Sequence, residues 1–255
     1  MIVSFLPSSR LAFLLSTLAG AAAAFDPSLR PRWSALACFV LFGLALDDLR
    51  PVGSLPASAP RPSRIARDLF LATLAGFVLV LLRGWPMLWV VLALGLVQIA
   101  LFMGPKLEET RLGGPLTVAA LGPLASAGAG LSIVGDFMPQ AFWIGLPIGF
   151  LADAGRRARA ASHPVPSRAS APPWFAGDLV AAFGVVPALV LSAGLPWHAL
   201  ASLLTLPLAT REMALARGTY SWLAAAARMR VLLATFAVLL AAAVFLARLL
   251  ATRAA

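Results

Sequence analysis

Long apolar runs separated by short polar stretches dominate the pattern of hydrophobic and polar positions along the chain. Apolar residues fill each run continuously, which indicates helices and excludes the two-residue alternation of an outer-membrane barrel. A membrane-crossing helix needs about 20 residues, so several runs are short for a full crossing. The pattern predicts an all-α, polytopic membrane bundle of about nine transmembrane helices, in one domain over residues 1–255. We place the runs at about 11–25, 33–47, 66–82, 85–104, 114–134, 140–153, 177–194, 196–210 and 231–251.

Composition supports burial of this chain in lipid. Hydrophobic residues make up 61% of the 255 residues and charged residues only 12%, whereas about 25% of a soluble domain is charged. The mean hydropathy is +0.91. One soluble core of this length cannot cover so much apolar surface. Cys38, His163 and His198 are the only Cys and His residues, so neither a disulfide framework nor a Cys/His metal cluster is expected.

Basic residues divide unequally between the two sides of the predicted bundle. The side with the N-terminus and the loops after the second, fourth, sixth and eighth runs carries 15 of the 20 Lys and Arg residues. The positive-inside rule places that side in the cytoplasm and the C-terminus outside, as in a multi-pass protein of a bacterial-type inner (plasma) membrane. We therefore assign the net charge of +10 to topology and expect no nucleic-acid partner. Arg10 and the alanines at 21–24 leave a second interpretation of the first run, a signal peptide.

Aspartates stand at the ends of two apolar runs, next to the two longest cytoplasmic connections. Asp47 and Asp48 precede a loop at about 48–65, and Asp153 precedes a loop at about 154–176. Both loops are rich in Pro, Ser, Arg and Ala. This shared layout predicts that the two loops face one another over a common cytoplasmic mouth.

A series of short motifs follows in order from the end of the third run to the eighth. They are Arg83–Pro86 (RGWP), Gly104–Lys106 with Arg111–Gly114 (RLGG), Gly122–Pro123 with Gly128, Leu146–Gly149 (LPIG) and Leu204–Ala209 (LTLPLA). Together with the nine-run plan, they resemble the UbiA superfamily of intramembrane prenyltransferases, most closely the branch that prenylates dihydroxynaphthoate in menaquinone synthesis. The resemblance extends over about residues 33–250, and its order and spacing are more specific than any single motif.

The resemblance implies a mechanism and a set of site residues. In the family, two aspartate-rich motifs bind Mg²⁺, which holds a prenyl diphosphate, and an aromatic acceptor captures the allylic cation in an apolar tunnel. It assigns the metal to Asp47, Asp48 and Asp153. It assigns the diphosphate to a basic set composed of Arg50, Lys106, Arg111, Arg156, Arg157 and Arg168.

The sequence departs from the family pattern at several of its catalytic positions. Pro51 stands where the first motif has a further aspartate, and Ala158 and Ser162 stand where the second motif has its acids. Pro115 replaces a glutamate of many relatives, and Thr110 replaces a tyrosine. These departures predict altered or weakened metal chemistry.

Two functions from different classes remain open. The first is a divergent membrane prenyltransferase that moves a polyprenyl group from a diphosphate to an aromatic or lipid acceptor. The second is a catalytically degenerate relative that serves as a lipid- or quinone-binding or assembly subunit of a membrane complex. A small transporter is a weaker third interpretation, because no ionisable residue lies in the middle of a run.

Each candidate residue also has a purely structural interpretation. Asp47 and Asp48 are ordinary interfacial carboxylates in this interpretation, one of them paired with Arg50. Asp153 pairs with arginines three and four residues further along a continuing helix. The basic set determines topology and contacts anionic lipid, and the small residues at 125–130 allow close helix packing.

Overall fold

The computed structural model describes residues 8–26, 32–49, 62–103, 113–161, 174–216 and 222–254, which are helical apart from short turns. The α-helices are α1 (Ser8–Ala24), α2 (Trp33–Asp48), α3 (Pro62–Arg83), α4 (Trp85–Met103), α6 (Gly113–Ala119), α7 (Ala125–Val134), α8 (Pro139–Trp143), α9 (Gly145–Ala160), α10 (Phe175–Ser192), α11 (Leu206–Leu215) and α12 (Trp222–Ala254). A π-helical turn, η2 (Ala120–Leu124), joins α6 to α7, and a 3₁₀ helix, η3 (Trp197–Thr205), leads into α11.

Every apolar run predicted from the sequence coincides with one helical rod of the described chain. Helices α6, η2 and α7 form one rod, α8 and α9 a second, and η3 and α11 a third. Three described helices are long and apolar enough to cross a membrane, Gly114–Val134, Phe175–Ser192 and Ala224–Arg253, and shorter apolar helices lie at Ser9–Ala24 and Trp85–Val97. The all-α bundle is confirmed, and the chain is a membrane protein.

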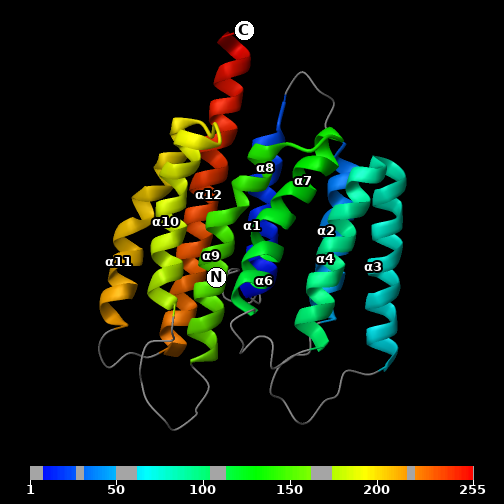
Figure 1. Cartoon of the computed structure of the whole chain (residues 1–255), viewed down its shortest axis with the longest axis horizontal. Helices are drawn as coiled ribbons and strands as arrows, with labels where there is room; N and C mark the ends of the chain where they lie inside the picture. The colour runs from blue at the N-terminus through cyan, green and yellow to red at the C-terminus, as the bar shows by residue number, and fades with distance from the viewer. Residues whose placement is uncertain are drawn as a thin grey trace.

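Successive rods run in opposite directions through the bundle (Figure 1). One end of the bundle is drawn at the bottom of Figure 1, and we call it the lower end. Helices α2 and α9 finish there, and α3 and α10 begin there. Ion pairs of Arg10 with Asp47 and Asp48 hold α1 to α2 at this end. At the upper end, the side chain of Gln140 donates a hydrogen bond to the carbonyl oxygen of Gly194 at 3.0 Å, which joins the start of α8 to the end of α10.

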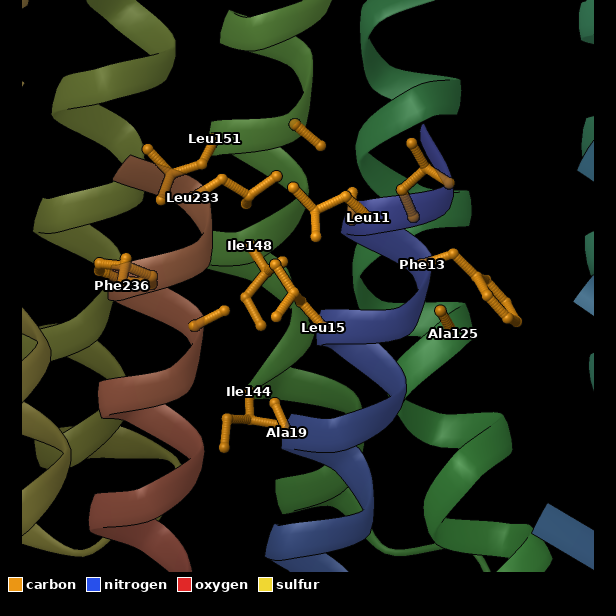
Figure 2. Packing of buried hydrophobic residues seen from close by; sticks show 14 of the residues in the cluster. Leu11, Phe13, Leu15, Ala19, Ala125, Ile144, Ile148, Leu151, Leu233 and Phe236 are labelled. Carbon is orange, nitrogen blue, oxygen red and sulfur yellow. The ribbon is translucent and has the colours of Figure 1, made fainter. Parts of the chain in front are cut away.

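Helix α1 lies inside the bundle, in contact with α7, α9 and α12. Its buried side chains interdigitate with those of α9 and α12 (Figure 2), among them Leu11, Leu15, Ala19, Ile144, Ile148, Leu151, Leu233 and Phe236. Close packing of apolar side chains stabilises the bundle core. The first run is therefore a central helix of the bundle in this structure.

Small residues let neighbouring helices approach backbone to backbone. A Cβ atom on Gly122 would lie 2.5 Å from the carbonyl oxygen of Gly145, and one on Gly130 would lie 2.7 Å from the Cβ atom of Ala141. Real Cβ atoms do not approach other atoms so closely, so any larger residue would separate these helices. The interpretation of residues 125–130 as a packing surface is confirmed.

Helices α3 and α4 form an apolar outer face. Large hydrophobic side chains of both helices are exposed, including Leu69, Phe70, Leu74, Phe77, Leu81, Trp85, Trp89, Leu92 and Leu96. So many exposed apolar side chains suit contact with lipid or with another membrane helix and not contact with water.

Candidate functional site

A cavity of about 1020 Å³ lies between the α6–η2 rod and the α8–α9 rod, and we call it the main cavity. Helix α9 supplies one wall through Leu146, Phe150, Asp153 and Arg157. These residues follow one another at intervals of three or four, so they share one face of the helix. From Leu146 to Arg157 this face is roughly 16 Å long at 1.5 Å per residue. The wall therefore changes from apolar to charged toward the lower end.

The opposite wall comes from α6 and from the π-helical turn. Val118, Ala119, Pro123 and Leu124 line it. Pro123 has no backbone N–H to donate, and the wider hydrogen-bonding pattern of a π turn accommodates it inside the rod. The hydroxyl of Ser126 donates to the carbonyl oxygens of both Gly122 and Pro123 at 3.1 Å, which satisfies backbone groups that the irregular turn exposes.

Four charged side chains form what we call the charged cluster at the lower end of the main cavity: Asp153, Arg156, Arg157 and Asp178. Asp153 is 1% exposed and accepts hydrogen bonds from Arg156 Nε at 2.7 Å and from Arg157 Nη2 at 2.8 Å. Arg157 Nε also donates to Asp178 Oδ2 at 2.8 Å, so one guanidinium joins two carboxylates on different helices. The prediction that Asp153 pairs with the arginines three and four residues further on is confirmed. The formal charges of the four side chains sum to zero.

Gly114 makes room for this cluster. A Cβ atom at this position would lie 2.6 Å from Arg157 Nη2 and 2.9 Å from Asp153 Oδ2. The absence of a side chain therefore lets the start of α6 pack directly against the ion pair. Any larger residue would displace Arg157 or push the two rods apart.

Trp174 lies beside the cluster in an unusual backbone conformation. Its φ of 71° falls in the left-handed region, which residues other than glycine rarely adopt. Its carbonyl oxygen accepts a hydrogen bond at 2.8 Å from the backbone N–H of Asp178, so the tryptophan introduces α10. The indole lines the main cavity while 70% of the residue remains exposed. A strained residue at the rim of a cavity is a typical feature of a functional site.

The other two predicted metal ligands lie elsewhere at the lower end. Arg10 Nε donates to Asp47 Oδ2 at 3.1 Å, and Arg10 Nη2 donates to Asp48. Asp48 lines a second cavity of about 350 Å³ between α2 and α3, which also contains Arg67 and Asp68.

The described residues do not form the common mouth that we expected between the two acidic ends. Asp48 and Asp153 line different cavities, and α1 contacts both α2 and α9. The connecting segments 50–61 and 162–173 lie outside the described residues.

The donor set in the described part of the chain does not fit a magnesium ion. No three His, Cys, Asp or Glu side chains there are grouped closely enough to hold a metal. Mg²⁺ requires oxygen ligands in near-octahedral geometry, and the guanidinium of Arg157 occupies the position between Asp153 and Asp178. Of the predicted diphosphate ligands, Arg156 and Arg157 belong to the charged cluster. The others lie outside the described residues: Arg50, Lys106, Arg111 and Arg168.

Sequence reasoning assigned no role in the site to Asp178, Trp174 or Gly114. Asp178 pairs with an arginine 21 positions earlier, and the pairing depends on how α9 and α10 pack. One local signal was present, because Asp178 is a carboxylate in the first turn of a long apolar run, where a charge requires a partner. Glu212 is a similar case: it is buried in α11 and bonded at 2.7 Å to Arg228 of α12.

No protein-family model matches the chain, and no curated protein matches it either. The resemblance to the UbiA superfamily accordingly rests on the sequence motifs alone.

Proposed function

We propose that this chain crosses the bilayer nine times and binds an isoprenoid lipid, with the apolar tail in the main cavity and the head group at the charged cluster. The observation that carries the proposal is the polarity of that cavity. Among the described residues that line it, apolar side chains cover most of its length, and the charged groups lie at the lower end. Ligand pockets are typically apolar with a few placed polar groups, and an amphipathic lipid has the matching distribution.

Two exposed tryptophans favour access from the membrane. Trp143 and Trp174 both line the main cavity, and 39% and 70% of these residues are exposed. Tryptophan is enriched at membrane interfaces, where its ring contacts lipid and its N–H contacts water. A lipid would then enter sideways between the rods without passing through water.

The proposed orientation has a cytoplasmic lower end in a bacterial-type plasma membrane. The 15-to-5 bias of basic residues supports it. Helix α1 begins toward the lower end and α12 finishes at the upper end (Figure 1), as an odd number of crossings requires. The short rods then cross with help from tilt and flanking residues.

Prenyl transfer within a divergent UbiA-like bundle is the second candidate. It is favoured by the directions of α2, whose last residue is Asp48, and α9, whose second half contains Asp153. Both helices finish at the lower end of the bundle (Figure 1), as a diphosphate site would require. Lipid binding ranks first because Asp47, Asp48 and Asp153 all have arginine partners in the structure. A binding or assembly subunit of a membrane complex needs no metal to work.

Lipid analysis of purified protein tests the proposal. The chain, extracted in mild detergent, should carry an isoprenoid lipid detectable by mass spectrometry. Leu146→Trp and Ala119→Phe fill the cavity from opposite walls and should lower the bound lipid about tenfold. Ala176→Trp, on the exposed side of α10, is the matched control and should retain it. Equal lipid content in all four proteins would contradict binding in the main cavity.

An activity assay separates the two candidates. Labelled prenyl diphosphate with Mg²⁺ is incubated with membranes that contain the wild type or Asp48→Asn. Robust turnover that this substitution abolishes would favour prenyl transfer. Negligible turnover by both proteins, with isoprenoid still bound, would favour the binding role.

A further inference from the structure

We infer that the charged cluster selects an uncharged head group that carries carbonyl or hydroxyl oxygens, and that it discriminates against a diphosphate. The inference rests on the proposed function, because it specifies the head group of the lipid whose tail lies in the main cavity. Isoprenoid alcohols and isoprenoid quinones or hydroquinones share this head-group chemistry.

The balanced charges of the cluster disfavour a diphosphate. The cluster holds two carboxylates and two guanidinium groups that are already paired with one another at 2.7–2.8 Å. A diphosphate at this end of the cavity would meet one arginine, Arg157, and both aspartates, because these three residues line it. The other arginine of the cluster, Arg156, is paired with Asp153. The diphosphate would also lose its hydration in a mostly apolar cavity, which strongly disfavours a bare multivalent anion. An uncharged head group avoids both penalties.

The carboxylates of the cluster are placed where a bound head group would meet them. Asp153, Asp178 and Arg157 all line the main cavity, so a ligand meets both signs of charge. The side chains of Asp153 and Asp178 are only 1% and 12% exposed, and neither can turn away into water without breaking its ion pair. Sites built for phosphate groups present N–H donors and cations to the anion. A cavity end with two fixed carboxylates beside a guanidinium is suited instead to an uncharged group. Its carbonyl or hydroxyl oxygens can accept hydrogen bonds from Arg157, and a hydroxyl group can also donate to a carboxylate.

The aromatic rim is compatible with either source of head group. Trp174 lies one helical turn before Asp178 and lines the cavity beside it. Its indole can stack on the ring of a quinone or cover the first isoprene unit of an alcohol.

Binding measurements with matched probes test the inference. The probes share one geranylgeranyl tail and differ in the head group: an alcohol, a quinone, and a diphosphate with and without Mg²⁺. Dissociation constants are obtained from the quenching of tryptophan fluorescence in detergent. At least one of the two uncharged probes should bind about tenfold more tightly than the diphosphate, equivalent to 1.4 kcal/mol, with no gain on addition of Mg²⁺. The tighter of the two uncharged probes identifies the source of the head group.

Removal of one negative charge should abolish this preference. Asp178→Asn keeps the shape of the side chain and leaves the cluster with a formal charge of +1. We expect diphosphate affinity to rise about tenfold, again 1.4 kcal/mol, and the affinity for the uncharged probes to stay nearly constant. Asp68→Asn, in the second cavity, is the matched control and should change neither affinity. Retention of the wild-type elution volume and unfolding transition identifies folded variants.

The outcomes distinguish failure of the inference from failure of the proposed function. Tighter binding of the diphosphate by the wild type, or a requirement for Mg²⁺, would overturn the inference and leave isoprenoid binding intact. An unchanged diphosphate affinity in folded Asp178→Asn would also overturn it. If no probe binds the wild type, the proposed function itself is wrong.

Discussion

Arg157 is the side chain whose loss should destabilise this protein most among the charged residues of the described chain. It bonds to Asp153 and Asp178 at 2.8 Å each and connects α9 to α10. In Arg157→Ala, Asp153 keeps its bond to Arg156, whereas Asp178 loses the partner that the structure gives it. A carboxylate that is only 12% exposed would then remain charged without compensation, or would have to take up a proton.

The size of the effect follows from the burial of this pair. Removal of one partner from a buried ion pair costs about 3–5 kcal/mol, because the other charge is left without compensation. The guanidinium is 19% exposed, so water compensates part of the loss and we expect about 3 kcal/mol. Adding Asp178→Asn to Arg157→Ala removes the stranded charge and should recover roughly 1–2 kcal/mol.

Unfolding by SDS in mixed micelles, followed by circular dichroism, measures these differences. Arg253→Ala is the control, since Arg253 lies exposed in the last turn of α12, and it should change stability by less than about 0.5 kcal/mol. The reasoning would be refuted if Arg157→Ala were as harmless as the control. It would also be refuted if the double variant were less stable than Arg157→Ala.

Three further predictions concern packing, capping and topology. Gly145→Ala should destabilise the bundle by about 1–3 kcal/mol, because its Cβ atom would collide with Ser126 and the backbone of Gly122. Gly184→Ala is the control, because its Cβ atom would meet no atom within 4 Å. In the same SDS assay, this control should raise stability by up to about 1 kcal/mol. Arg83→Ala should cost about 1.5–3 kcal/mol there, because the guanidinium donates to backbone carbonyls at the end of α7, and an effect below about 0.5 kcal/mol would show that these bonds are unimportant. Reporter fusions should give a cytoplasmic signal at the N-terminus and an exterior signal at the C-terminus, and a cytoplasmic C-terminal signal would reject the nine-crossing arrangement.

The helices could be predicted from the sequence because each depends on a local property of the chain. An apolar run long enough to form a helix is visible without knowledge of its neighbours, and all nine runs coincide with helical rods. The pairing of Asp153 with Arg156 and Arg157 was predictable for the same reason, since the helical period fixes which side chains share a face.

The site could be predicted only in part because it depends on contacts between distant segments. Asp47 and Asp48 pair with Arg10, which lies 37 and 38 positions away and which the sequence did not suggest. The neighbouring Arg50, the partner that the sequence suggested, lies outside the described residues. The two acidic ends looked equivalent in the sequence, but packing places Asp48 and Asp153 in different cavities. No periodic pattern reports which helices become neighbours.

Arginine partners supply the compensating charge that carboxylates need in so apolar a bundle. A carboxylate at the end of a membrane helix needs a compensating charge when it is buried. In the family that the motifs resemble, Mg²⁺ is the expected source of that charge. In this structure, Arg10 forms ion pairs with Asp47 and Asp48, and Arg157 forms ion pairs with Asp153 and Asp178. The missing family acids and these arginines change the site in the same direction, since both lower the negative charge that would attract a divalent cation. Asp178→Asn is therefore the most informative single change at the proposed site, because it alters the charge at the cavity and leaves its shape almost unchanged.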